Sequence, residues 1–183
     1  MWRTVARITT LMIGSLTILG CLLEPEEPVA AALVGLQLRI DTSHGKTGVG
    51  VGSTTLTADG RIIVTGIGPT PKVCAISLTS ADHQTLLDLA ALVEWAELQS
   101  DYISPENPDG CCDQLGYTLS ATLALAEGGK PSYTAFWFDE ATKGGAYGLP
   151  PAFRQLVTTL FEMRYDYTVN GLCLETASSQ VEQ

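Results

Sequence analysis

The sequence has few charged residues, and basic residues are the scarcer kind. Only 16% of the 183 residues are Asp, Glu, Lys or Arg, and 20 acidic residues outnumber 10 basic ones, which gives a formal net charge of −10. An acidic protein repels phosphate backbones and lacks the main electrostatic driving force for binding DNA or RNA. The composition therefore excludes nucleic acid as a partner.

Recognisable catalytic and cofactor motifs are also missing. The chain has two histidines, His44 and His83, without zinc-ligand spacing and without a CxxC motif. The segments Gly45–Thr47, Gly48–Gly52 and Glu106–Gly110 fail the patterns of a phosphate loop, a dinucleotide turn and an EF-hand. We therefore expect no metal, no cofactor and no enzymatic activity. A hydrolase stays open as an alternative that would need a cleft joining a histidine to a nucleophile or carboxylate.

The chain nevertheless has enough apolar surface to fold. Hydrophobic residues make up 45% of the sequence, and three Trp, six Tyr and four Phe are among its residues. Burying such side chains offsets the entropy that a chain loses on ordering. A length of 183 residues favours one domain with a real core.

The N-terminus has the layout of a secretory signal. Arg3 and Arg7 come first without any acid, and the apolar run Ile8–Gly20 follows. This run is shorter than the roughly 20 residues that a membrane-spanning helix needs. Residues 1–21 are therefore predicted to be a signal peptide, and their removal leaves 8 basic and 20 acidic residues.

The end of this segment, Ile18–Cys21, resembles the lipobox of bacterial lipoproteins, in which the cysteine is lipidated and becomes the new N-terminus. The resemblance implies an exported protein anchored to the cell membrane or outer membrane through a lipid on Cys21. Two alternatives are cleavage near Val29–Ala32, which releases a soluble secreted protein, and an uncleaved anchor. Residues 22–33 are rich in Pro and Glu and are predicted to form a tether.

The remaining cysteines are Cys74, Cys111, Cys112 and Cys173, an even number in an oxidising compartment. They are predicted to form two structural disulfides. A bond between the neighbours Cys111 and Cys112 would strain the peptide between them. Each member of this pair is therefore expected to bond either Cys74 or Cys173, with the choice left open.

Hydrophobic periodicity predicts six strands and two helices, arranged as four strands, a helix, two strands and a helix. Val34, Leu36, Leu38 and Ile40 are expected to share one face of the first strand. An Asp59–Gly60 turn is expected to join the second and third strands. The predicted strands are Val34–Ile40, Ser53–Ala58, Arg61–Gly66, Val73–Leu78, Tyr117–Leu125 and Ser132–Phe138; the predicted helices are Ala81–Gln99 and Pro150–Arg164.

These elements predict an α+β fold in which two helices pack on one face of an antiparallel sheet of about four to six strands. The single domain is expected to span residues 34–173. Thr79 is expected to cap the first helix, with Asp82 reaching back toward it. Residues 101–114 are predicted to form an irregular loop, and residues 174–183 a polar tail.

Several features of the middle and end of the chain follow one another in a characteristic order. They are the Asp59–Gly60 hairpin, Leu78–Asp82 before a helix, Tyr117–Leu119 with a glycine turn, a strand ending at Phe138–Asp139, and the helix segment Leu149–Leu156. Over residues 35–164 this order is similar to the emfourin family, protein inhibitors of thermolysin-like metalloproteases. The four later cysteines and the segment Gly45–Gly52 depart from the family, and no protease-contacting residue is carried over.

The sequence therefore predicts an exported cell-envelope lipoprotein with a small protein-binding domain. The resemblance implies inhibition of a secreted metalloprotease as its specific activity. The alternative is an envelope lipoprotein that binds or supports another component without inhibiting a protease.

Overall fold

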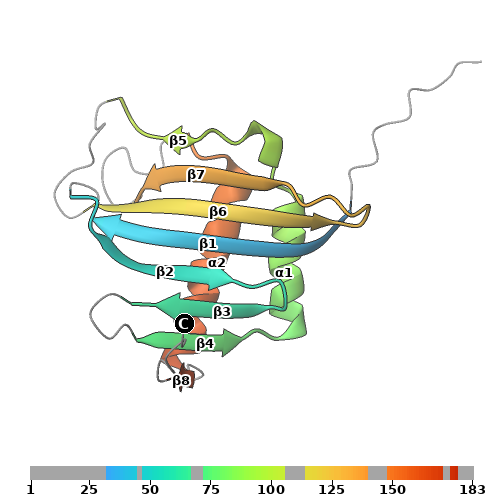
Figure 1. The fold of residues 1–183 in the computed structure, drawn as a ribbon, viewed down its shortest axis with the longest axis horizontal. Helices are drawn as coiled ribbons and strands as arrows, with labels where there is room; N and C mark the ends of the chain where they lie inside the picture. The colour runs from blue at the N-terminus through green and yellow to red at the C-terminus, as the bar shows by residue number, and fades with distance from the viewer. Residues whose placement is uncertain are drawn as a thin grey trace, which may run out of the picture. The chain divides into compact units, whose positions relative to one another are not determined.

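The computed structural model describes residues 32–44, 47–66, 72–105, 114–139, 148–170 and 174–176. Within these ranges one sheet of eight strands has the order β5-β7-β6-β1-β2-β3-β4-β8 (Figure 1). Every neighbouring pair is antiparallel except β5 and β7, which are parallel. The strands are β1 Leu33–His44, β2 Gly50–Leu56, β3 Arg61–Thr65, β4 Val73–Ser77, β5 Asp101–Tyr102, β6 Leu115–Leu125, β7 Ser132–Phe138 and β8 Leu174–Thr176.

Two helices, α1 (Ser80–Ala91) and α2 (Pro151–Val169), contact each other and pack against the same face of the sheet (Figure 1). A short 3₁₀-helix, η1 (Trp95–Glu97), follows α1. This arrangement confirms the predicted α+β class and the two helices on a mostly antiparallel sheet. The sheet is wider than the four to six strands expected, because the two short edge strands β5 and β8 carry no periodic pattern of their own.

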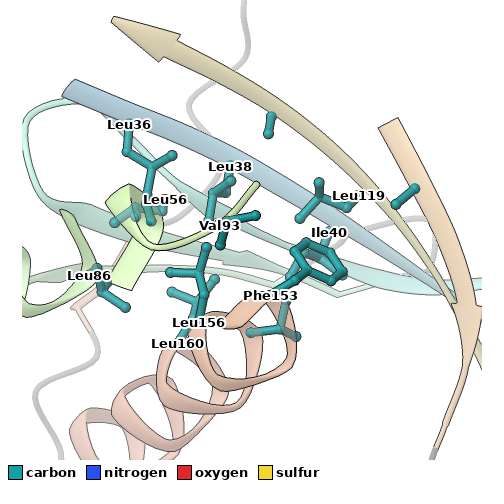
Figure 2. Packing of buried hydrophobic residues seen from close by; sticks show 14 of the residues in the cluster. Leu36, Leu38, Ile40, Leu56, Leu86, Val93, Leu119, Phe153, Leu156 and Leu160 are labelled. Atoms are coloured by element: carbon teal, nitrogen blue, oxygen red, sulfur yellow. The ribbon is translucent and has the colours of Figure 1, made fainter. Parts of the chain in front are cut away.

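The core lies between the sheet and the helices. Alternate side chains of β1 and β6 point to the helix side, as the period of two in their sequences predicts. From β1, Leu36, Leu38 and Ile40 are fully buried against α2 residues such as Phe153 and Leu156 (Figure 2). Burying one such side chain contributes about 1.5–3 kcal/mol, so this contact accounts for much of the stability of the fold.

Val34 does not share the face of Leu36, contrary to the prediction, and its exposed fraction is 60%. The register between β1 and β6 shifts between Leu33 and Gly35, so Val34 is an extra residue in a β-bulge. A bulge leaves one residue unpaired and breaks the alternation of faces. The hydrophobic pattern alone does not reveal this shift.

The β2–β3 hairpin forms where it was predicted, but its loop has three residues, Ala58–Gly60, and not two. The amide of Gly60 donates to the carbonyl of Thr57 at 3.0 Å, and the amide of Thr57 donates to Arg61 at 2.8 Å. A three-residue hairpin loop of this kind typically combines a type I turn with a residue in the left-handed region. Gly60 has φ = 78°, which explains the glycine at this position.

Helix α1 ends at Ala91, earlier than the predicted Gln99. The indole Nε1 of Trp95 donates to the carbonyl of Ala90 at 2.8 Å, and Trp95 is buried. The same carbonyl also accepts from the amide of Val93 at 3.2 Å, so the indole is an additional donor at the end of the helix. Helix α1 therefore ends beside the buried Trp95, which belongs to the short η1 helix that follows it.

The ends of other elements also differ from the predictions. Helix α2 continues to Val169, beyond the predicted end near Arg164. Strand β1 begins at Leu33, inside the predicted tether, and β8 lies inside the predicted polar tail. Strand β5 lies within the segment that was predicted to be irregular, where Asp101 pairs with a residue of β7.

The N-terminus of α1 is bound to α2 by hydrogen bonds. The hydroxyl of Thr79 accepts from the amide of Asp82 at 3.1 Å, which confirms the predicted cap. The amide of Thr79 donates to the hydroxyl of Tyr167 at 3.2 Å, and that hydroxyl donates to the carboxylate of Asp82 at 2.5 Å. The hydrogen bond from Tyr167, followed by that from Thr79, lowers the pKa of Asp82. The carboxylate of Asp82 therefore accepts from the Thr79 hydroxyl. The Thr79 amide, which the Asp82 side chain was expected to bind, donates to Tyr167 of the other helix.

We predict that Tyr167→Phe lowers the free energy of unfolding at pH 7 by about 1–2 kcal/mol, because it removes two hydrogen bonds, one of them to a carboxylate. Urea denaturation measures this loss. Because Asp82 has a lowered pKa in the folded state, its stabilising contribution is present at neutral pH and is lost as the pH falls through that pKa. The difference between variant and wild type should therefore shrink in acid.

The matched control is Tyr165→Phe, because Tyr165 lies on the same helix with an exposed fraction of 66%. Its loss of stability should stay within about 0.5 kcal/mol. Equal losses for the two variants, or a Tyr167→Phe loss that does not change with pH, would contradict the proposed role of this network.

Candidate functional site

A groove is lined by residues of α2 and of the neighbouring ends of β6 and β7. Tyr117, Trp137 and Phe161 supply its aromatic wall, and its volume is about 220 Å³. Arg154 and Asp139 also line it. We call this feature the aromatic groove.

Strand register and helix packing bring the aromatic wall together. Tyr117 and Trp137 are register partners on β6 and β7, and their rings stack with centroids 5.5 Å apart. The ring of Phe161 lies 5.7 Å from that of Tyr117. Trp137 meets the buried ring of Phe153 edge-on at 5.5 Å, which joins the wall to the core. Contacts of this kind hold the rings in fixed positions.

A second hollow continues along the exposed side of α2, with a volume of about 580 Å³. Thr158 and Phe161 line both hollows. The second hollow adds the carboxylates of Glu162 and Asp166 and the exposed ring of Tyr165. One side of α2 therefore has a continuous, uneven surface that combines aromatic and charged groups.

Arg164 lies beside the aromatic groove. Its guanidinium Nη1 donates to the hydroxyl of the buried Thr54 at 2.8 Å, and its Cζ lies 5.4 Å from the centroid of the Phe161 ring. Ion pairs between described residues join Arg39 to Asp41 and Arg61 to Asp59 and do not include Arg164. Within the described part of the chain, the partners of Arg164 are therefore a hydroxyl and a ring.

Burial and nearby charges shift the pKa of the Tyr117 hydroxyl. Burial is the largest cause that raises its pKa, and the negative charge of Asp139 adds to the effect. The positive charge of Arg164 acts in the opposite direction. Tyr117 is therefore a neutral hydrogen-bonding group at physiological pH.

Of the residues predicted as modification sites, Cys21, Cys111, Cys112 and Cys173 lie outside the described residues. Cys74 lies on β4, half-buried against the core, and is disulfide-bonded. Its bonding partner is not among the residues that the structure describes. The identity of that partner stays a prediction.

The sheet register narrows this choice. Four strand spacings of about 4.8 Å each separate β4 from β6, at whose start the chain from Cys112 enters the sheet. Strand β8, by contrast, is the immediate neighbour of β4, with Leu174 opposite Ala75. Because Glu175, the register partner of Cys74, comes two residues after Cys173 in the chain, we expect Cys173 to be a nearer partner for Cys74 than the two cysteines expected from sequence.

We predict that Cys74 is bonded to Cys173 in the oxidised protein. Proteolysis without reduction, followed by mass spectrometry, should recover a linked peptide pair containing these two cysteines. Thiol alkylation before digestion prevents exchange during the measurement. A linked peptide joining Cys74 to Cys111 or Cys112 would contradict the prediction and support the pairing expected from sequence.

The two histidines lie apart. His44 is exposed at the end of β1, whereas His83 lies in the first turn of α1, against Gly60 at the opposite end of the sheet. The Nε2 atom of His83 is buried and has no hydrogen-bond partner among the described residues. The part of the chain that the structure describes contains no group of three or more His, Cys, Asp or Glu side chains placed to hold a metal ion.

The sequence did not identify the aromatic groove as a site. Tyr117 and the aromatic residues of Ser132–Phe138 were assigned to the core, and Phe161 and Arg164 were not assigned a role. The density of aromatic residues in β7 was the one signal available. The core assignment is nevertheless confirmed: Trp137 is a buried member of the core, and Tyr117 is partly buried against it.

Comparison with protein-family models finds no match, and neither does comparison with curated proteins. The described helices include none that is both long and apolar enough to span a bilayer.

Proposed function

We propose that the protein is an exported cell-envelope lipoprotein whose domain binds another protein through the aromatic groove. The observation that carries this proposal is the groove itself, an open hollow with three ordered aromatic side chains and a neighbouring arginine. Aromatic residues and arginine are the side chains most enriched at the energetic centres of protein interfaces.

The shape of the site, more than its size, favours a protein partner over a small-molecule ligand. The aromatic groove of about 220 Å³ is smaller than the roughly 300–1,000 Å³ of pockets that enclose drug-sized ligands, whereas the adjoining hollow of about 580 Å³ is an extended surface along α2. The groove itself accommodates one or two apolar side chains. The adjoining hollow on α2 extends the surface that a bound segment can contact.

The anchor in this proposal is the lipid on Cys21, supported by the signal layout and the lipobox resemblance. The first strand begins at Leu33, so the residues between the anchor and the sheet can span up to about 40 Å when extended. This reach separates the domain from the membrane surface and leaves the groove accessible.

The proposed partner is a secreted metalloprotease or another envelope protein. The emfourin resemblance supports a protease, because it covers residues 35–164 and therefore includes Tyr117, Trp137 and Phe161. A shared scaffold does not by itself establish a shared site. Binding through the groove and inhibition of a protease are therefore tested separately.

A photoreactive p-benzoylphenylalanine at Thr158 tests the groove in living cells. Thr158 is exposed and lines both hollows. We predict a crosslinked product of one defined additional mass. The matched control carries the same group at Thr134, which is exposed on β7 and pairs with Ser120. No crosslink at Thr158, or the same product from both positions, would contradict binding at the groove.

The purified exported chain is then assayed against a thermolysin-like metalloprotease. Inhibition at micromolar concentration that is lost in Phe161→Ala would support the inhibitory form of the proposal. If the protease is not inhibited, the proposal that this protein is a protease inhibitor is wrong. If the Thr158 crosslink is nevertheless observed, the groove binds a different envelope protein.

Cys21→Ser tests the anchor. We predict that this variant loses metabolic labelling with a fatty acid and is no longer recovered in the membrane fraction. Cys74→Ser is the matched control and should be labelled as the wild type is. Unchanged labelling and membrane partitioning of Cys21→Ser would overturn the lipid anchor.

A further inference from the structure

Arg164 is a half-buried cation that has no anionic partner among the residues that the structure describes, in a protein with twice as many acidic as basic residues. A guanidinium group has five N–H donors, and a single donor bond, to Thr54, is formed within the described part of the chain. A partly buried charge costs free energy unless it is paired. The other guanidinium donors have no partner among the described residues and are available to donate to a ligand.

The guanidinium is held in place by two contacts of different kinds. Thr54 is fully buried at the centre of β2, so its hydroxyl is a fixed acceptor. The ring of Phe161 supports the guanidinium from one side through a cation–π contact. Because both partners are ordered, the group does not have to be immobilised when a ligand binds, and less conformational entropy is lost.

The acidic residues that share α2 with Arg164 do not neutralise it. Glu162 and Asp166 line the hollow on the solvent side of the helix and form no ion pair with Arg164. Phe161, in contrast, contacts Arg164 and also lines the aromatic groove. The positive charge therefore lies next to the apolar wall of the groove.

We propose that Arg164 binds a carboxylate of the partner protein, supplied by an acidic side chain next to an apolar side chain that occupies the aromatic groove. We choose a carboxylate because its charge is opposite to that of Arg164 and because the planar guanidinium group can donate two parallel hydrogen bonds to its two oxygens. The inference rests on the proposed binding function and adds the chemistry of the bound segment: one large apolar residue followed or preceded by Asp or Glu.

The test uses 3-phenylpropanoate as a probe, because it joins an aromatic ring to one carboxylate. Its neutral counterpart, 3-phenylpropanamide, has nearly the same shape. Binding to the purified exported chain is followed by NMR through the side-chain Nε–H of Arg164 and the ring of Tyr117. We expect saturable binding of the acid and at least tenfold weaker binding of the amide, because charged hydrogen bonds are about twice as strong as neutral ones.

Arg164→Met should remove the preference for the acid, because methionine keeps an apolar contact with Phe161 and has no charge. Arg39→Met is the matched control, since Arg39 is exposed and paired with Asp41; this variant should keep the preference. The comparison of acid with amide on the wild-type protein decides the question even if Arg164→Met fails to fold.

Preference for the acid would run against the net charge of −10, so a general electrostatic effect cannot produce it. Equal binding of acid and amide would overturn the carboxylate site and leave the groove proposal intact. A preference that persists in Arg164→Met would also overturn the inference. The Thr158 crosslink reports on the groove independently of both results.

Discussion

The packing of α2 against the centre of the sheet is the contact on which the other features depend. Phe153, Leu156 and Leu160 fill the space above the buried side chains of β1 (Figure 2). Because interiors are packed at near-crystalline density, these contacts fix the position of the helix to within a fraction of a side chain. The position of the helix in turn decides which part of the sheet is covered and which part borders the aromatic groove.

Polar contacts then join the other parts of the domain to α2. The hydroxyl of Tyr167 takes the place of a side chain from α1 in the cap of that helix, so the two helices cannot separate without losing both bonds. Arg164 reaches from α2 to Thr54 on β2 and supports the ring of Phe161. Helix α2 therefore contributes core residues, the Tyr167 hydrogen bonds to the start of α1, and one wall of the proposed binding surface.

Much of the fold could be predicted from local patterns. The alternation in β6 and the uninterrupted aromatic strand β7 predicted their elements closely, and Thr79 was correctly assigned as a cap. The errors occur where tertiary contacts override a local pattern. Trp95 ends α1 by bonding the carbonyl of Ala90, and a bulge turns Val34 to the outside. Strand β8 forms because β4 offers it an edge to pair with.

The sequence by itself determined the acidic charge, the α+β class and the faces of the long strands, because composition and periodicity are properties of the chain alone. It also supplied the signal layout from which export is proposed. The aromatic groove and the position of Arg164, which has no carboxylate partner among the described residues, were decided by the tertiary structure. Tyr117, Trp137 and Phe161 come from three elements, and only strand register and helix packing bring their rings together. No local pattern encodes which side chains at the border of the core also line a hollow at the surface.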